Sequence, residues 1–193
     1  MRKIQLLAGL LAMSASVPAA AATIVTFNSG SGVLPAGFTV FQDYEGLSGG
    51  TPGASIGANA FVFNSSVTNQ AVRPAFGSAG NYAAVQANGS YSVSFGPTTR
   101  FGFIVGSLDT YNRLTLNFEG GGTQTFAGGQ IINAVSFPSG DASSPLANGF
   151  VYFDVTSGPR LIGATFESGG NSFEFDNLAT APVPEPATWA IMV

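Results

Sequence analysis

The chain of 193 residues has no cysteine and no histidine. Without cysteine it can form neither a disulfide bond nor a thiol nucleophile. Without histidine it lacks the commonest general base, the usual zinc ligand and the side chain that titrates near neutral pH. Serine is plentiful, but the only lysine that could activate one is Lys3, next to the N-terminus. Thiol, serine–histidine and histidine-bound zinc chemistries are therefore excluded.

Charged residues are also scarce. They make up 8% of the chain, whereas about 25% is ordinary for a soluble domain. The chain instead contains 26 glycines and 17 phenylalanines, and 45% of its residues are apolar. That apolar content is enough to build a core and argues against disorder. Length and composition favour a single secreted all-β domain over a cytosolic enzyme.

The N-terminal segment is typical of a secretory signal peptide. Arg2 and Lys3 precede an apolar run over residues 4–17, and Ala20 and Ala22 then stand in the A-x-A pattern of a cleavage site. We therefore expect residues 1–22 to be a signal helix that is removed on export. Four arginines and ten carboxylates would remain, which gives a net charge of −6. An exported protein this acidic is a poor partner for nucleic acid or anionic lipid.

Short stretches of alternating apolar and polar residues, separated by turn-forming residues, extend from Thr23 to about Leu178. They predict antiparallel strands, and the glycine-rich turn at 119–122 predicts a hairpin. No stretch in this region keeps a helical period over three turns. We therefore predict an all-β domain over residues 23–178, an antiparallel β-sandwich of jelly-roll type, with an up-and-down barrel as the second choice. The expected strands are 23–27, 37–41, 59–63, 82–86, 91–95, 100–108, 113–118, 123–126, 148–155, 161–167 and 172–178.

Two pairs of carboxylates are spaced so that each pair shares one side of a strand. Asp43 and Glu45 form the first pair, and Glu174 and Asp176 form the second. Calcium prefers such oxygen ligands, so Glu45 and Asp176 are candidate ligands of a structural calcium ion that ties the terminal strands together. The alternative is that all four carboxylates are the solvated face of edge strands.

Two further interpretations concern sugars. Tyr44, Tyr82, Tyr91, Tyr111 and Tyr152 could form a platform on which sugar rings stack, or they could be core and cross-strand residues. A glycosidase that uses paired carboxylates is also open, because it needs only aspartate and glutamate. The sequence selects no particular pair among the ten carboxylates that follow the signal peptide.

The C-terminal end resembles the sorting signal of PEP-CTERM proteins, in the variant written P-E-P-x-x-W-A. Pro184, Glu185, Pro186, Trp189 and Ala190 match that motif in order. They lie in residues 179–193, which we interpret as a proline-rich linker followed by the sorting motif. As in that family, the motif accompanies a signal peptide and a body rich in glycine and phenylalanine.

The resemblance implies an exported protein of a Gram-negative bacterium that is processed by an exosortase, an integral-membrane sorting enzyme. It also implies a place at the cell surface or in an exopolysaccharide or biofilm matrix. The family tail continues with a membrane helix of about 20 apolar residues and an arginine-rich end, whereas this sequence stops three residues after Ala190. We expect the sequence to be a fragment, with transient inner-membrane association where that helix exists.

Two functions are therefore expected from the sequence. The first is a non-catalytic surface or matrix protein that binds extracellular polysaccharide. The second is a secreted glycan-active hydrolase that uses paired carboxylates. An aromatic surface without paired carboxylates would favour binding, whereas two carboxyl groups about 5–9 Å apart in a cleft would favour hydrolysis.

Overall fold

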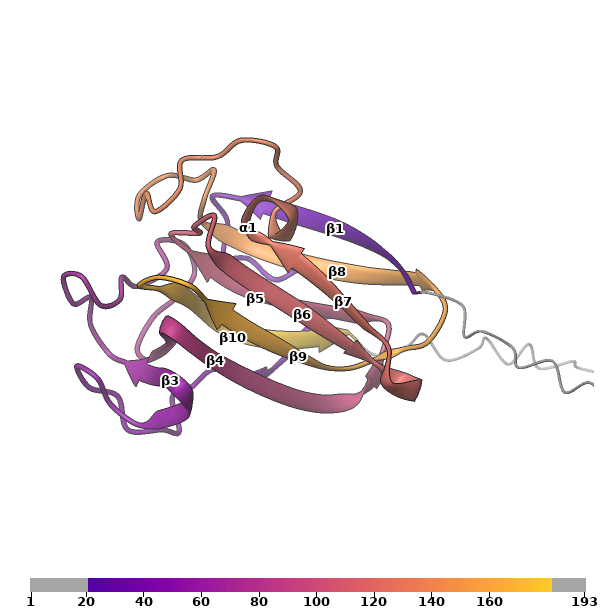
Figure 1. The fold of residues 1–193 in the computed structure, drawn as a ribbon, viewed down its shortest axis with the longest axis horizontal. Coiled ribbons are helices and arrows are strands. Elements are labelled where there is room, and N and C mark those ends of the chain that lie inside the picture. Colours follow the sequence, from indigo (N-terminus) through magenta and orange to yellow (C-terminus); the bar gives the residue numbers. More distant parts are fainter. Residues whose placement is uncertain (1–20, 182–193) are drawn as a thin grey trace, which may run out of the picture.

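The computed structural model describes residues 21–181. They form ten strands, one short 3₁₀ turn and one helical turn, which Figure 1 labels along the chain. The elements are β1 (Ala22–Ser29), β2 (Thr39–Gln42), β3 (Ser55–Phe63), β4 (Tyr82–Thr98), β5 (Arg100–Gly106), β6 (Asn112–Phe118), η1 (Glu119–Gly121), β7 (Thr123–Ala127), α1 (Gly128–Ile131), β8 (Gly149–Ser157), β9 (Leu161–Ser168) and β10 (Phe173–Ala181).

The strands form one antiparallel sheet in the order β1-β8-β5-β10-β4-β9-β6-β7, with β2 paired to β10 and β3 paired to β4. The prediction of an antiparallel all-β domain is therefore confirmed. Every expected strand lies on an observed strand, and the expected strands 82–86 and 91–95 are parts of the single strand β4. The hairpin at 119–122 joins β6 to β7 as predicted. No helix within residues 21–181 has the length and apolar character needed to cross a bilayer.

The sheet is curled, so that strands that are not neighbours in its order pack against each other (Figure 1). Phe166 on β9 stacks on Phe175 on β10 with ring centroids 3.9 Å apart, although β4 lies between these strands. Phe126 on the last strand, β7, lies 4.9 Å from Phe153 on β8 at the other side of the sheet. The inner face therefore closes on itself around a core of phenylalanines, and such aromatic contacts add to the stabilisation from buried area.

Strand β4 carries the sheet around this bend. Its first part pairs with β10 over residues 83–85, and its second part pairs with β9 from Gly89 onward. Between the two parts, Asn88 has a φ of +57° and is followed by Gly89. Asparagine tolerates this left-handed conformation better than most residues, so Asn88-Gly89 allows one strand to serve both halves of the sheet.

Two expected boundaries differ from the structure. β3 begins at Ser55, four residues before the expected start of this strand at residue 59. β10 continues to Ala181, three residues beyond the expected end of the domain, and Thr180 pairs with Thr39 of β2 and with Phe101 of β5. The last residues of β10, Ala179–Ala181, show no alternation of large apolar and polar side chains, so the sequence does not mark them as a strand. Pairing with the neighbouring strands β2 and β5 extends β10 over them.

Candidate functional site

Strand β10 places its two carboxylates on the face opposite its phenylalanines. Phe173 and Phe175 enter the core, whereas Glu174 and Asp176 point to the other side of the sheet. The alternation predicted from the sequence is correct, but the solvated-edge interpretation is wrong for this pair. Glu174 and Asp176 are only 2% and 1% exposed. The reason is that β10 lies between β5 and β4, and the loop 64–81 covers its polar side.

Glu174 is surrounded by hydrogen-bond donors. Its Oε1 accepts from the backbone N–H of Val72 at 3.0 Å and from the Ser172 hydroxyl, and its Oε2 accepts from the Ser107 hydroxyl at 2.8 Å. Burial raises the pKa of the Glu174 carboxyl to about 7, while the three donors act in the opposite direction. The carboxyl therefore titrates near neutral pH although it contacts no basic side chain.

Asp176 joins the same loop at a second point. Its Oδ2 accepts from the Ser78 hydroxyl at 2.7 Å, and its Oδ1 accepts from the backbone N–H of Asn177 at 2.7 Å. Burial raises the pKa of Asp176 to about 7, the two donors lower it, and the negative charges of Glu45 and Asp43 raise it further. Two buried carboxylates, two residues apart, thus hold the loop 64–81 on the sheet.

The other predicted pair, Asp43 and Glu45, lies in the turn after β2 and not on a strand, so that part of the prediction is wrong. Both residues are exposed, as expected. Glu45 Oε1 accepts the backbone N–H of Asn81 at 2.8 Å, and its carboxylate lies so close to Gly80 that a Cβ there would collide with it. Within residues 21–181, no three His, Cys, Asp or Glu side chains gather in a way that could hold a metal ion.

A polar cavity of about 260 Å³ opens beside Glu174. It is built by four segments that are far apart in the sequence: part of the loop 64–81, the segment after β5, the segment between α1 and β8, and the segment that leads into β10. Its lining is Asn69, Gln70, Ala71, Val72, Ser107, Asp109, Tyr111, Gly140, Asn171, Ser172 and Glu174. The cavity thus combines one aromatic ring with two carboxyl groups, amides and hydroxyls, and it has no cationic side chain in its lining.

Tyr111 is the aromatic member of this cavity. The residue is 39% exposed, and its hydroxyl lies 2.6 Å from Asp109 Oδ2 and 2.6 Å from the carbonyl oxygen of Asn171. The hydroxyl has one proton, so it donates to one of these acceptors at a time. Burial and the adjacent Asp109 carboxylate raise the pKa of the Tyr111 phenol, which keeps it protonated and able to donate.

The five tyrosines do not form one platform. Tyr44 and Tyr82 are fully buried, Tyr91 is 9% exposed, and these three pack against phenylalanines or each other. Tyr152 packs against Phe150. For these four the core and cross-strand interpretation holds, and Tyr111 alone combines an exposed ring with a place in a cavity.

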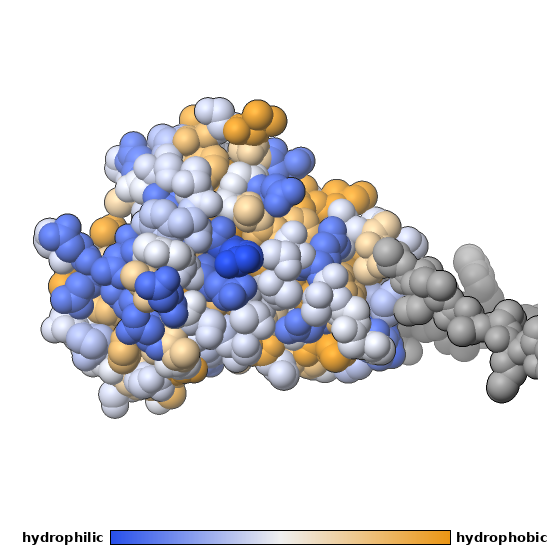
Figure 2. Space-filling model, viewed as in Figure 1, coloured by the Kyte–Doolittle hydropathy of each residue, from blue (hydrophilic) through white to orange (hydrophobic). Residues whose placement is uncertain are grey.

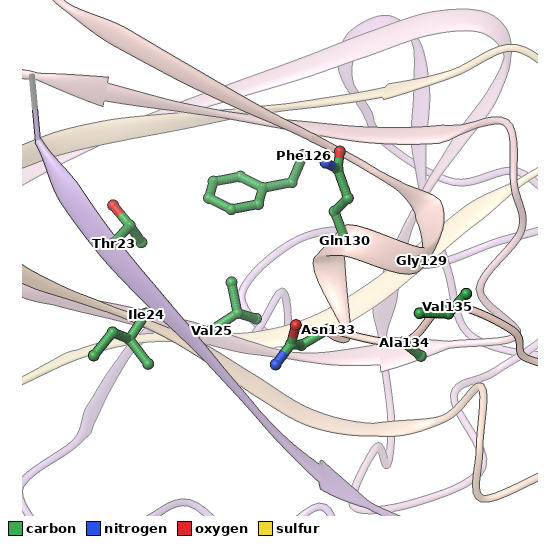
Figure 3. Close-up of a pocket in the computed structure, with 9 residues that line it drawn as sticks. All are labelled: Thr23, Ile24, Val25, Phe126, Gly129, Gln130, Asn133, Ala134 and Val135. Carbon is green, nitrogen blue, oxygen red and sulfur yellow. The ribbon is translucent and has the colours of Figure 1, made fainter.

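A second, open cavity of about 560 Å³ lies between β1 and the β7–α1 region (Figure 3). Its lining is Thr23, Ile24, Val25, Phe126, Gly129, Gln130, Asn133, Ala134 and Val135, with no charged side chain among them. We call it the β1 groove. Figure 3 shows Thr23 and Val25 pointing toward Phe126, whereas Ile24 points away from it. Without ionisable groups, the groove offers shape and hydrogen bonds but no acid–base chemistry.

Several predicted residues lie outside the described range. They are Ala20 of the cleavage site and the sorting-motif residues Pro184, Glu185, Pro186, Trp189 and Ala190. Ala22 is the first residue of β1 and pairs with Ser157 of β8. Comparison with protein-family models, with curated proteins and with solved structures finds no match for this chain.

The buried carboxylates predict that stability depends on pH. The folded-state pKa of Glu174 is raised to about 7 from an ordinary value of 4.5, so the folded protein keeps a proton that the unfolded chain releases. The resulting stabilisation is fully present below the unfolded pKa and is lost as the pH rises through about 7. We expect the free energy of unfolding to be higher at pH 5 than at pH 8, by about 3 kcal/mol from Glu174 alone at most. Urea titrations across this range measure it.

The matched variants are Glu174→Gln and Glu167→Gln. The first should reduce the pH dependence without abolishing it, because the amide keeps the size of Glu174 and removes its titration, whereas the raised pKa of Asp176 still contributes. The second changes a partly exposed carboxylate that lies 3.4 Å from Arg113, and it should leave the dependence intact. Stability that rises from pH 5 to pH 8 in the unmodified protein would contradict the assigned pKa direction.

Proposed function

We propose that the chain is an exported protein of a Gram-negative cell surface or biofilm matrix that binds extracellular polysaccharide without catalysis. The carrying observation is the polar cavity, in which an exposed tyrosine ring stands beside carboxyl, amide and hydroxyl groups. Sugars present apolar faces and rings of hydroxyl groups, and such mixed sites recognise both. No nucleic-acid partner is proposed, because the protein after signal cleavage would be acidic.

The export and sorting parts of this proposal rest on the two ends of the sequence. The signal-peptide pattern over residues 1–22 and the resemblance to the PEP-CTERM motif support an exosortase as the processing partner. Ala22 pairs with Ser157 in the folded sheet, and the Ala22 carbonyl oxygen accepts the Thr156 hydroxyl at 3.2 Å. Cleavage after Ala22 would therefore precede the docking of β1, while the chain is still unfolded during export.

The alternative function, a glycan hydrolase, has Asp109 and Glu174 as its carboxylate pair in the polar cavity. A hydrolase of this type needs one carboxyl group to give its proton to the sugar and the other to attack or to activate water. Both oxygens of Glu174 are taken by protein donors, and the side chain is 2% exposed. Both oxygens of Asp109 are also engaged, by Ser139 and Tyr111. Because all four carboxylate oxygens already accept hydrogen bonds from the protein, the site favours sugar binding over hydrolysis.

We also propose that the curled sheet is a jelly-roll-like sandwich. One half would be β1-β8-β5-β10 and the other β4-β9-β6-β7. The support is the packing between these halves, where Phe103 on β5 lies 4.9 Å from Phe166 on β9 in an edge-to-face arrangement. In such a fold the loops at the ends of the strands are the usual places for ligand sites, as with the segments that line the polar cavity.

Sugar binding is expected to depend on Tyr111. Titration of the exported protein with soluble oligomers of glucose, mannose, galactose and N-acetylglucosamine should find at least one ligand. Tyr111→Ala should then weaken binding about fivefold, because loss of an aromatic contact is worth about 1 kcal/mol. Calorimetry measures the affinity, and an assay for new reducing ends tests the hydrolase alternative in the same samples.

Phe41→Ala is the matched control, since Phe41 is also 39% exposed but lies on β2, outside the cavity lining. It should leave affinity unchanged. Binding that both variants weaken equally would place the sugar site elsewhere, and release of reducing ends that Glu174→Gln abolishes would favour hydrolysis.

Sorting is tested separately in a host that has the exosortase, with a membrane helix and basic end added after Val193. Glu185→Ala should leave unprocessed precursor in the inner membrane, because Glu185 is the only charged residue of the P-E-P-x-x-W-A match. Immunoblots of membrane and surface fractions measure it, with Thr188→Ala at an unspecified motif position as the control. Equal processing of both variants would show that the motif match is accidental.

Structural calcium at Glu45 and Asp176 stays a proposal. Its support is that Glu45 and Asp43 repel the charge on Asp176, a cost that a cation would relieve. Calcium takes six to eight oxygens, so backbone oxygens and water would have to complete the site. A hundredfold excess over Kd should stabilise the fold by about 2.7 kcal/mol and raise Tm by roughly 5–10 °C. Chelator should reverse the rise and Asp176→Asn should abolish it; a Tm indifferent to calcium would refute the site.

A further inference from the structure

The outer edge of β1 is open along the whole strand. Among residues 21–181, β1 pairs with β8 alone, in continuous register from Thr23 to Ser29. The backbone N–H and C=O groups on its other side therefore face the β1 groove or solvent. β7 is the opposite end of the sheet order, but it is shorter, with five residues against eight, and it leads directly into α1.

The edge of β1 also lacks the features that normally keep two edge strands apart. Natural edge strands are protected by lysine or other charges, by proline, by bulges or by short length. The sequence of β1, ATIVTFNS, contains no charged residue and no proline, and its only register shift lies at its first residue. Ile24 is 56% exposed, and its side chain points away from Phe126. Such a strand is a template for another strand of the same character.

The groove beside this edge supplies room for a partner's side chains. Thr23 and Val25 point into it, and no charged side chain in its lining opposes an apolar or hydroxyl-bearing partner. The hydroxyl oxygen of Thr23 is buried and has no hydrogen-bond partner within the described part of the chain. Because that oxygen is closed off from solvent, a docking strand does not reach it, and the contact depends on the backbone edge of β1. In Figure 2, apolar surface gathers over the region of β1 and β7.

We propose that β1 pairs antiparallel with β1 of a second copy of this chain, which joins the two sheets into one across a twofold axis. An isologous contact of this kind must be self-complementary, and β1 meets that requirement because both of its faces are uncharged. Its nearest charge in the register is Asp154, opposite Ile24, and Arg100 neutralises it at 2.5 Å. No like charges would therefore face each other at the centre of the contact, although the chain as a whole is acidic.

The test is the oligomeric state of the exported full chain, measured by sedimentation velocity over a range of concentrations. We expect a dimer, and we expect Ile24→Lys to weaken dimerisation at least tenfold by placing like charges on both copies. Because Ile24 is more than half exposed, the lysine should leave the fold intact, which far-ultraviolet circular dichroism checks. Val33→Lys is the matched control: Val33 is 74% exposed and lies outside the groove, so this variant should stay dimeric.

A single engineered cysteine gives an independent readout in a chain that has none of its own. Under oxidation, at least one of Val25→Cys and Thr26→Cys near the middle of β1 should form a covalent dimer, whereas Val33→Cys should not. A monomer at all concentrations, or a dimer that Ile24→Lys leaves unchanged, would overturn the proposal. The chain's own C-terminal segment is a competing occupant of the groove, and Trp189, the only tryptophan, reports on it. A monomer with a blue-shifted tryptophan emission that Ile24→Lys abolishes would show that this segment fills the groove. That result would also overturn the proposal of a β1 dimer. None of these outcomes bears on the polar cavity, so the proposed function is tested separately.

Discussion

Strand β10 buries both of its faces, and the rest of the structure depends on the packing of its apolar face and the hydrogen bonding of its acidic face. On the inner face, the rings of Phe175 and Phe166 stack at 3.9 Å across the curl of the sheet. On the other face, Glu174 and Asp176 would be very costly to bury without hydrogen bonds. The apolar face therefore fixes the curl, and the acidic face requires a second layer of polar groups over the sheet.

The loop 64–81 is that second layer. Val72 and Ser78 donate to the two carboxylates, and Pro74 packs on Gly106 of β5, where a Cβ would sit 2.7 Å from the proline Cα. Arg73 holds the loop in shape: it donates to the carbonyl oxygens of Asn64 and Gly80 and lies over the ring of Tyr82 at 5.1 Å. Beside Glu174 the loop 64–81 does not cover the sheet completely, and the polar cavity lies in the space that remains. The location of the polar cavity therefore follows from the buried carboxylates of β10.

The strands could be predicted from the sequence because alternation and glycine punctuation are local signals. Every expected strand was found, and the side assigned to Glu174 and Asp176 on β10 was correct. Their burial could not be predicted, because it depends on a loop about a hundred residues away in the sequence that covers a central strand. The cavity was missed for the same reason: Asp109, Asn171 and Glu174 meet only in the folded chain. Tyr111 was named as one of five tyrosines, and only the packing of the other four in the folded chain distinguishes it.

The two proposals concern different parts of the molecule and can act together. The polar cavity is lined by the loop 64–81, by the segments that adjoin β5 and β10, and by Gly140 between α1 and β8, whereas the pairing edge is β1, two strands away from β5 in the sheet. Self-association through β1 would therefore leave both cavities of a dimer open. A polysaccharide repeats the same sugar unit along one chain, so a dimer could engage two units of one strand or link two strands. Two weak sites on a rigid dimer then give an avidity that neither site has alone, provided that their spacing matches the polymer. A small cavity with modest affinity would be sufficient for such a protein.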